Sequence, residues 1–446
     1  MNNAKHILLL VALLLGRVGV GCAQDNARMS DHTIMGTARY VGMSGAMTAI
    51  GGDPSAALDN PAGLGLYRRS EVLLTGDFSF DRTSQSLATG AEKRNIAMIP
   101  QASWVISLMT SNPTEVGAQY HNFMFSFHRL HSFYRNMYAT AEGEASLGAL
   151  FASTGVDMGI DYCADRTALS NELLLQESGY IHDYGIDWAM NISNRWYVGA
   201  GLHVQSYNLT ADATYKEVFP TINADGLNYA NRNVTYLHYR GSGANGSLGV
   251  LYRPLNWLRL GFSLQTPSIA TLTINSDGTF TGRTDSVRSS EAPYLTGKDK
   301  FSAPLHTSTS VAFQLGTLGM LALQYDYRHT LYQEHYHSMR VGLEIIPVMG
   351  LYLNAGYAYE STFGSQSNIV NIDPTLERQD AYYQVPKYSQ YASVALGYRG
   401  EFIIVQAAYQ FRWQAMQLYA HQNATPYSLE SQTHRIVLTL GWHRRN

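Results

Sequence analysis

The chain has 446 residues, 15% of them charged, and a formal net charge of −3 at pH 7. A composition so close to neutral gives no basic surface for nucleic acid, which excludes DNA or RNA binding as the main function. Cys22 and Cys163 are the two cysteines, so no disulfide framework is expected to hold a chain of this length. Tyrosine is abundant, with 31 residues, and this residue collects at membrane–water interfaces.

Residues 1–23 have the pattern of a secretory signal peptide. After a basic start, Ile7–Leu15 is an unbroken apolar run, and Gly21 and Ala23 take the small-residue positions of a cleavage site. We expect cleavage after Ala23. A lipoprotein site at Cys22 ranks second, because Gly19 stands where such a site usually has leucine. The apolar run is shorter than the roughly 20 residues of a membrane-spanning helix, and no other stretch comes closer, so no transmembrane helix is predicted.

Residues 24–69 form a segment rich in Gly and Ala ahead of the first strand. Small residues suit a segment threaded inside a barrel, because glycine permits sharp turns and a close approach to a wall. We therefore predict a plug, called the hatch below. Asp53, Asp59 and Asn60 are expected to hydrogen-bond to wall side chains, and Asn60-Pro61 to form a tight turn. An ordinary Gly/Ala-rich loop is the alternative.

From Glu71 onward, apolar and polar residues alternate with a period of two. The apolar side of the first strand is formed by Val72, Leu74, Phe78 and Phe80, opposite Thr75 and Asp77. The next strand is expected to place on one face Ile96, Met98, Pro100, Ala102, Trp104, Ile106 and Leu108. Alternation over about ten residues, apolar outward and polar inward, is typical of outer-membrane strands.

About fourteen such strands follow one another, joined alternately by long and short connections. Long loops are predicted at 139–179, 215–232 and 275–300, and short turns at 193–195 and 317–319. This order is typical of an up-and-down barrel and not of a Greek-key sandwich. Residues 70–446 are therefore predicted to form one all-β domain, a transmembrane antiparallel β-barrel with the hatch in its lumen. Because the strand count is even, both termini are expected in the periplasm.

The hatch also carries a recognisable motif. Its sequence GGDPSAALDNPAGL begins with Gly51, Gly52 and Asp53 and contains the triplet Asn60, Pro61 and Ala62. The whole of Gly36–Leu66, and this triplet in particular, resembles the hatch of the FadL/TodX outer-membrane transporters. The segments around Trp104 and Phe123–Arg135 are similar to family members from Bacteroidetes.

The resemblance implies a fourteen-stranded barrel in the outer membrane of a Gram-negative bacterium. Such a protein carries long-chain fatty acids or other hydrophobic molecules passively, with the hatch as its gate and without a catalytic residue, cofactor or metal. Its expected partners are a hydrophobic small molecule and outer-membrane lipid, and it is expected to be monomeric.

Two places on the ligand path are suggested by the residues. The predicted loop 139–179 carries Leu169, Leu173 and Leu174, an apolar cluster that marks either a ligand-binding surface or simple packing on neighbouring loops. Pro100 lies in the middle of a strand, where proline cannot donate a ladder hydrogen bond. Some family members have a wall opening near a kink in the third strand, and if this chain has one, it is expected beside Pro100. The alternative is a bulge without a transport role. Residues 121–137, the presumed third strand, contain neither Gly nor Pro, so no kink is predicted there.

Several other sequence patterns give weaker evidence of function. Residues 241–246 match a dinucleotide fingerprint but lie within a strand, so that interpretation is rejected. The strand glycines could instead face the hatch, or simply allow curvature; they are Gly241, Gly243, Gly246 and Gly249. His128 and His131 have opposite parity and are expected on opposite faces of a strand.

Passive import is the leading functional hypothesis, with two alternatives. His335 and His337 share a face and suggest hemin binding, although solvated loop histidines are the simpler interpretation. A barrel adaptor of type IX protein secretion is the other, since the inward set Asp183, Asp187 and Asn191 is more polar than a fatty-acid tunnel needs.

Overall fold

The structure, a computed structural model, describes residues 33–85, 91–110, 117–143, 145–154, 160–329, 335–361, 383–420 and 424–443. The predicted signal peptide, residues 1–23, lies outside these ranges. None of the helices within them is both long enough and apolar enough to cross a membrane.

Four short helical segments and seventeen strands occupy the described ranges. The helical segments are α3 (Ala38–Gly42), α4 (Pro54–Asp59), the 3-10 helix η1 (Pro61–Leu66) and α5 (Leu147–Thr154). The strands are β1 (Glu71–Gln85), β2 (Ala91–Met109), β3 (Ala118–Ser132), β4 (Arg135–Glu142), β5 (Ser170–Ile192), β6 (Trp196–Ile222), β7 (Asn228–Leu255), β8 (Leu258–Gln265), β9 (Ile269–Arg283), β10 (Val287–Ser302), β11 (Leu305–Gln314), β12 (Gly319–His329), β13 (His335–Ile345), β14 (Leu351–Ser361), β15 (Tyr383–Arg399), β16 (Ile403–Tyr419) and β17 (Tyr427–His443).

The seventeen strands form one closed antiparallel sheet. Three of them prolong others: β4 continues β3 along β5, β9 continues β8 along β7, and β10 leads into β11. The wall therefore contains 17 − 3 = 14 strands. β1 pairs with β17 from Glu71 opposite His443 to Gln85 opposite Leu429, which closes the barrel. The predicted all-β barrel of about fourteen strands is confirmed.

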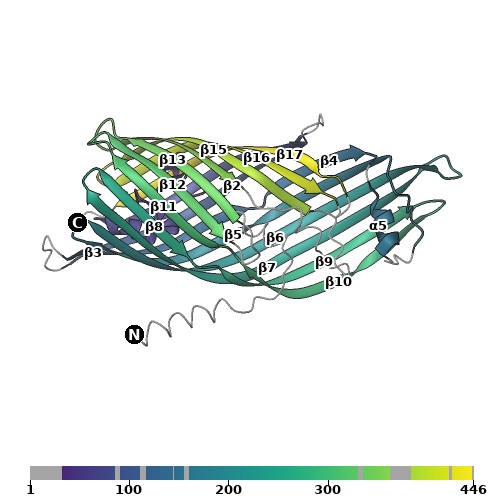
Figure 1. Cartoon of the computed structure of the whole chain (residues 1–446), viewed down its shortest axis with the longest axis horizontal. Coiled ribbons are helices and arrows are strands. Elements are labelled where there is room, and N and C mark those ends of the chain that lie inside the picture. Colours follow the sequence, from purple (N-terminus) through teal and green to yellow (C-terminus); the bar gives the residue numbers. More distant parts are fainter. Residues whose placement is uncertain are drawn as a thin grey trace.

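The hatch lies inside this barrel (Figure 1, purple). α3 contacts β14, β15, β16 and β17 on one side of the lumen, whereas η1 contacts β5, β6 and β7 on another. The described part of the hatch therefore spans the bore from wall to wall.

Side chains alternate across the wall in the predicted sense. On β1, Val72 and Leu74 point outward and are 52% and 51% exposed, whereas Thr75 and Asp77 point inward and are fully buried. The inward hydroxyl of Thr75 donates to Gln101 Oε1 at 3.0 Å. The outer surface thus presents hydrocarbon, and the polar inward groups find their partners within the lumen.

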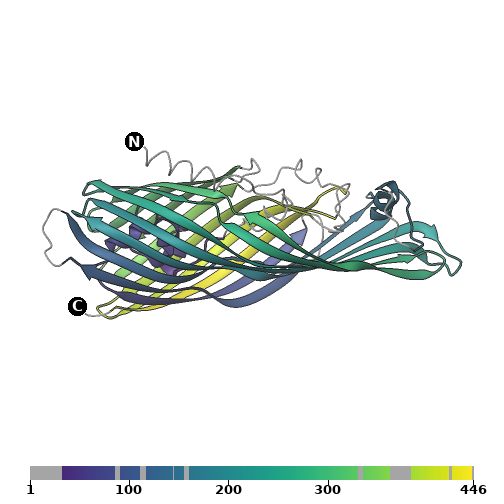
Figure 2. The ribbon, with the colours of Figure 1, turned by 90° about the horizontal axis from the view of Figure 1, so that it is seen from below.

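Strands β5, β6 and β7, together with β4, β9 and β10, continue past the other strands and form an arm at one end (Figure 2, right). The polarity of the two faces inverts there. Along β6, the outward side chains change from Leu202 and Val204, 74% and 56% exposed, to exposed polar residues such as Asp212. The inward ones become apolar: Leu209 is fully buried in a cluster that also includes Leu147 of α5. The arm therefore has a polar exterior and its own apolar core.

The alternation of β2 changes phase at Pro100. Thr75 pairs with Gln101 but Asp77 pairs with Met98, so β2 contains one extra residue, a β-bulge. An extra residue reverses the faces of every side chain beyond it. The expectation that the apolar residues of β2 share one face is therefore wrong: Ile96 and Met98 face the lumen, whereas Ile99, Trp104 and Leu108 face outward.

The long connections predicted as loops are largely strand. Residues 139–179 contain the end of β4, α5 and the start of β5, while 215–232 and 275–300 lie mostly in the paired strands of the arm. The prediction is wrong here because arm strands carry polar side chains on the face that meets water, which gives them a loop-like composition.

The third wall strand breaks although it contains neither Gly nor Pro. β3 ends at Ser132 and β4 begins at Arg135. At the break, the backbone N–H of Phe133 donates to the carbonyl of Gly179 at 3.1 Å, and Gly179 has a φ of +127°. The glycine that accommodates the break therefore lies on the neighbouring strand β5, where the residues of β3 give no sign of it.

Candidate functional site: the hatch and the cavities around it

The hatch turns sharply at Gly51 and Gly52, whose φ angles are +62° and +65°. A Cβ atom at Gly51 would lie 2.7 Å from the Cα of Gly63, so no side chain fits there. Asp53 follows as the N-cap of α4, and its carboxylate accepts from Ser55 N at 2.9 Å and from a hatch threonine hydroxyl at 2.8 Å. Both partners belong to the hatch. The expectation that Asp53 binds the wall is therefore wrong.

The triplet Asn60-Pro61-Ala62 forms the predicted turn and also fastens it. Asn60 is fully buried, and its Nδ2 donates to the carbonyl of Thr48 at 3.0 Å and to that of Val250 in β7 at 3.3 Å. Its Oδ1 accepts from Ala62 N at 3.1 Å, and Pro61 begins η1. One amide thus joins two parts of the hatch to the backbone of the wall, and not to a wall side chain as expected.

The turn lies directly against wall glycines. A Cβ atom at Gly199 of β6 would approach Ala62 N to 2.5 Å, and one at Gly249 of β7 would lie 3.0 Å from Pro61 Cδ. Hatch backbone therefore replaces wall side chains at these positions. Of the β7 glycines considered from the sequence, Gly249 faces the hatch, whereas Gly241 and Gly243 face β9 and Gly246 meets no hatch atom.

Two arginines, Arg340 buried and Arg39 partly buried, connect the hatch to the wall by charge. Arg39 of α3 forms a two-pronged ion pair with Glu344 of β13, at 2.6 Å and 2.9 Å. Arg340 of β13 lies 3.5 Å from Asp59 of α4 and 3.0 Å from Asp326 of β12. Asp59 thus meets a wall side chain as predicted. Sequence reasoning missed both arginines, although Arg340 and Glu344 share the inward parity of β13 and could have been noted on that basis.

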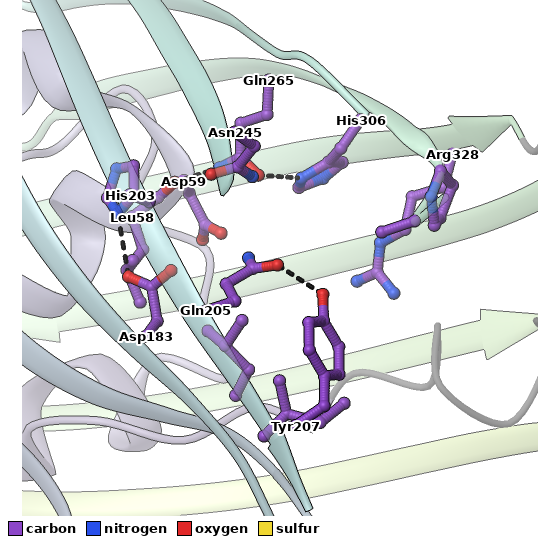
Figure 3. A pocket seen from close by; sticks show the side chains of 14 residues that line it. Leu58, Asp59, Asp183, His203, Gln205, Tyr207, Asn245, Gln265, His306 and Arg328 are labelled. Atoms are coloured by element: carbon purple, nitrogen blue, oxygen red, sulfur yellow. Dashed lines mark hydrogen bonds and ion pairs between the residues drawn. The ribbon is translucent and has the colours of Figure 1, made fainter. Parts of the chain in front are cut away.

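A cavity of about 90 Å³, called the lumen cavity, lies directly against the C-terminal end of α4 (Figure 3). It is surrounded by β3, β5, β6, β7, β8, β11 and β12. Its polar lining consists of Asp59, Asp183, His203, Gln205, Asn245, Gln265, His306 and Arg328, and the remaining lining of Leu58, Leu130, Ile181, Tyr207, Ala303 and Pro304.

Most polar groups of the lumen cavity are already paired. His203 lies between two carboxylates, 2.8 Å from Asp183 and 3.4 Å from Asp187. The hydroxyl of Tyr207 donates to Gln205 Oε1 at 2.5 Å. The polar inward residues of β5 and β6 therefore form a fixed network beside the hatch, with room for a small ligand group next to it.

A second cavity of about 60 Å³, called the side cavity, adjoins the start of the described hatch and β2. Beside it, the β2–β3 ladder ends at Gln101 opposite His128, so Pro100 and the preceding residues of β2 have no paired residue in β3 within the described chain. The contact there is made by side chains, with Arg129 Nη1 3.5 Å from Met98 Sδ. The wall beside Pro100 thus lacks backbone hydrogen bonds between these strands.

His128 and His131 both face the lumen, contrary to the prediction. The β3–β5 register shifts between Arg129 and His131, and this bulge turns both imidazoles inward, where they are buried. His131 Nδ1 lies 3.0 Å from the hydroxyl of Thr33 in the hatch.

His335 and His337 lie on β13 rather than in a loop, and they point outward. Their Nδ1 atoms lie 2.5 Å and 2.7 Å from the hydroxyls of Tyr327 and Tyr325. These residues form part of an aromatic surface on the outside of the barrel, remote from the lumen. Within the described ranges, no group of three or more His, Cys, Asp or Glu side chains is placed to hold a metal ion.

The three leucines assigned to a ligand-binding loop do not form one surface. Leu169 precedes β5 and is 55% exposed, whereas Leu173 and Leu174 lie on β5 and point in opposite directions. Leu173 is fully buried in the core of the arm. The loop assignment is wrong for Leu173 and Leu174, because they belong to a strand whose polarity is inverted.

Solved structures share this fold. The chain matches a Pseudomonas aeruginosa FadL homologue with a TM-score of 0.59 and 11% identity, covering 92% of this chain and 99% of that one. The fold is that of a FadL-type channel. The toluene transporters TbuX of Ralstonia pickettii and TodX of P. putida match with TM-scores of 0.54 and 0.53 and identities of 12% and 13%. They cover 92% and 93% of this chain, and 99% of each transporter is covered.

No protein-family model and no curated protein matches the sequence. At these identities the likeness is one of fold. The resemblance predicted from the hatch motif is confirmed at that level, since the FadL-type fold extends over nearly the whole chain.

Proposed function

We propose that this protein is an outer-membrane channel for the passive uptake of hydrophobic or amphipathic small molecules, with long-chain fatty acids as the first candidates. The observation that carries the proposal is the lumen cavity, which lies against a buried hatch inside a barrel with an apolar outer surface. Solved structures of the same fold include toluene transporters.

The arrangement of charges favours a route that leaves the hatch in place. Movement through the bore would separate the ion pairs Arg39–Glu344, which is partly buried, and Arg340–Asp59, which is buried, and breaking a buried pair is costly. Sideways movement beside Pro100 would break no β2–β3 backbone hydrogen bond. In this proposal the transported molecule moves from the apolar inner face of the arm to the lumen cavity and then leaves through the wall beside Pro100.

Uptake of radiolabelled oleate by a Gram-negative host that lacks its own fatty-acid channel tests the proposal. Expression of the full chain should raise uptake several-fold over the empty vector. Toluene uptake is measured in parallel to compare an uncharged hydrocarbon. A heat-dependent shift in gel mobility verifies that the barrel is folded. Vector-level uptake of both compounds by a correctly folded, membrane-inserted barrel would contradict the proposal.

A further inference from the structure

The outer surface of the barrel carries two neighbouring cations, called the cation pair below. Arg82 of β1 lies directly opposite Lys93 of β2, and both side chains point outward and are exposed. Neither forms an ion pair or a hydrogen bond with another residue that the structure describes. Glu430 of β17, an acid on the same face, lies opposite Ser84 instead. Like charges directly opposite each other destabilise a sheet, so an anion from outside the chain would stabilise this pair.

The cation pair lies where the apolar outer band of the barrel ends. Phe80 is the last outward apolar residue of β1, 45% exposed, and the first cation follows two positions later. Near the end of the strand, the side chain of Gln85 binds both backbone polar groups of Thr140 in β4, at the base of the arm. Just before β1, by contrast, Arg68 donates to Asn194 in the short turn after β5, at 2.6 Å. Short turns are periplasmic in barrels of this kind, which assigns the cation pair to the external leaflet.

A row of outward side chains connects the cation pair to aromatic residues on the neighbouring strands. Arg82 is opposite Gln432 of β17, which is opposite Trp413 of β16. Two residues further along β17, His434 Nδ1 lies 2.7 Å from the hydroxyl of Tyr409 in β16. Tyr and Trp collect at the level of lipid head groups. Because neighbouring strands lie about 4.8 Å apart, this polar and aromatic surface from β16 to β2 is about 14 Å wide.

A shallow apolar groove adjoins this surface on the lipid-facing side of the barrel. Its volume is about 520 Å³, and its lining comes from β13, β14, β15 and β16. Two small exposed residues, Ala355 and Ala392, lie there among Tyr357, Tyr409 and Phe411. The alanines leave space between the aromatic rings, and a flexible acyl chain fits such a space. Since Tyr409 belongs to both the groove and the polar surface, one amphiphile can occupy the two together.

We propose that this outer surface binds a phosphorylated glycolipid of the external leaflet, of the lipid A type. Its phosphoryl oxygens accept hydrogen bonds from Arg82 and Lys93, and one of its acyl chains lies in the groove beside Tyr409. A broad head group with several acyl chains spans the strands from β16 to β2, whereas a phospholipid with two chains covers fewer of them. The inference requires an outer-membrane location but does not depend on what the channel transports.

Native mass spectrometry of the full chain in non-ionic detergent tests this proposal with three lipids. They are bisphosphorylated lipid A, monophosphorylated lipid A with the same acyl chains, and phosphatidylglycerol. We expect the double variant Arg82→Gln/Lys93→Gln to weaken binding of bisphosphorylated lipid A by about tenfold or more, as for two cations near a membrane surface. The matched control Lys216→Gln/Arg232→Gln removes another exposed pair of directly opposite cations, on the exterior of the arm. It should leave the binding unchanged.

A third variant tests the groove without changing any charge. Ala392→Trp fills the space between the aromatic rings and should weaken the binding of both forms of lipid A alike. Equal losses in the two double variants would overturn the role of the cation pair. Binding of phosphatidylglycerol as tight as that of bisphosphorylated lipid A would overturn the choice of a glycolipid. Folding of each variant is verified by its heat-dependent gel mobility.

Discussion

Arg340 contacts one carboxylate of the hatch and two of the wall. Its guanidinium reaches Asp59 and the carbonyl of Gly45 in the hatch, and Asp326 and Glu360 in the wall. All three carboxylates are buried. Removing the arginine from such a group leaves buried negative charges uncompensated, at a cost of about 3–5 kcal/mol.

The two sides of this network can be separated by substitution. Asp59→Asn removes only the carboxylate of the hatch, so we expect the barrel to keep its stability while the hatch loosens. Arg340→Met removes the arginine from three buried carboxylates and should lower the free energy of unfolding by about 3–5 kcal/mol. Conductance in planar bilayers measures whether the hatch has loosened, and unfolding in guanidinium measures the stability of the barrel. Wild-type conductance in Asp59→Asn would show that Asp59 does not hold the hatch.

Glu217 fastens α5 to the inner face of the arm. Its carboxylate accepts from Leu147 N at 2.5 Å and from the hydroxyl of Ser146 at 3.3 Å. Burial raises the pKa of Glu217 above its ordinary value. The folded state therefore holds the proton more tightly than the unfolded chain. The contribution of Glu217 to stability is complete below its ordinary pKa, and it is lost as the pH rises through its raised pKa.

We therefore expect α5 to dock more firmly at about pH 5 than at about pH 8, because folded Glu217 loses its proton at higher pH than it does in the unfolded chain. Glu217→Gln mimics the protonated form and should remove this difference. Amide hydrogen exchange of residues 145–154, corrected for the intrinsic rate at each pH, provides the measurement. Equal pH dependence in wild type and variant would exclude Glu217 as its source.

Among the elements, the contact between β2 and β3 is the one that the proposed path depends on. Pro100 has no N–H to donate, and the ladder toward β3 ends next to it. Pro100→Ala restores the donor. We expect it to reduce oleate uptake and to stabilise the barrel by about 1 kcal/mol, the net value of one hydrogen bond.

Pro347→Ala, in the exposed turn between β13 and β14, is the control for a general effect of removing proline, and it should leave uptake unchanged. Wild-type uptake in Pro100→Ala would favour a bulge that plays no part in transport.

Local signals explain what the sequence could predict. The alternation of β1 and the hatch turn at Asn60 depend on neighbouring residues, and both were found. The inward position of Met98 could not be predicted, because one bulge residue reverses parity and leaves no mark in composition. The burial of Leu173 was also hidden, since it requires knowing where the polarity of β5 inverts. Arg340 was missed because its role depends on the carboxylates that elements distant in sequence bring around it.

At the scale of the whole molecule, the inversion of polarity along β6 separates two environments on one strand. Leu202 lies on the outward face within the barrel, and Thr214 lies on the same face within the arm. At about 3.3 Å per residue, the two positions are roughly 40 Å apart along the strand, and a strand tilt of about 35–45° makes this about 30 Å along the membrane normal, the thickness of a bilayer's hydrocarbon core.

The same substitution at these two positions therefore tests where the membrane lies. Leu202→Arg places a charge in the hydrocarbon region and should destabilise the barrel by about 2–4 kcal/mol, whereas Thr214→Arg should cost about 0–1 kcal/mol because its side chain meets water. Guanidinium titration of protein folded into lipid vesicles measures both. Because strand, face and introduced residue are matched, only the surroundings differ. Equal costs would mean that the arm is also embedded in lipid, and the apolar core of the arm would then need another explanation.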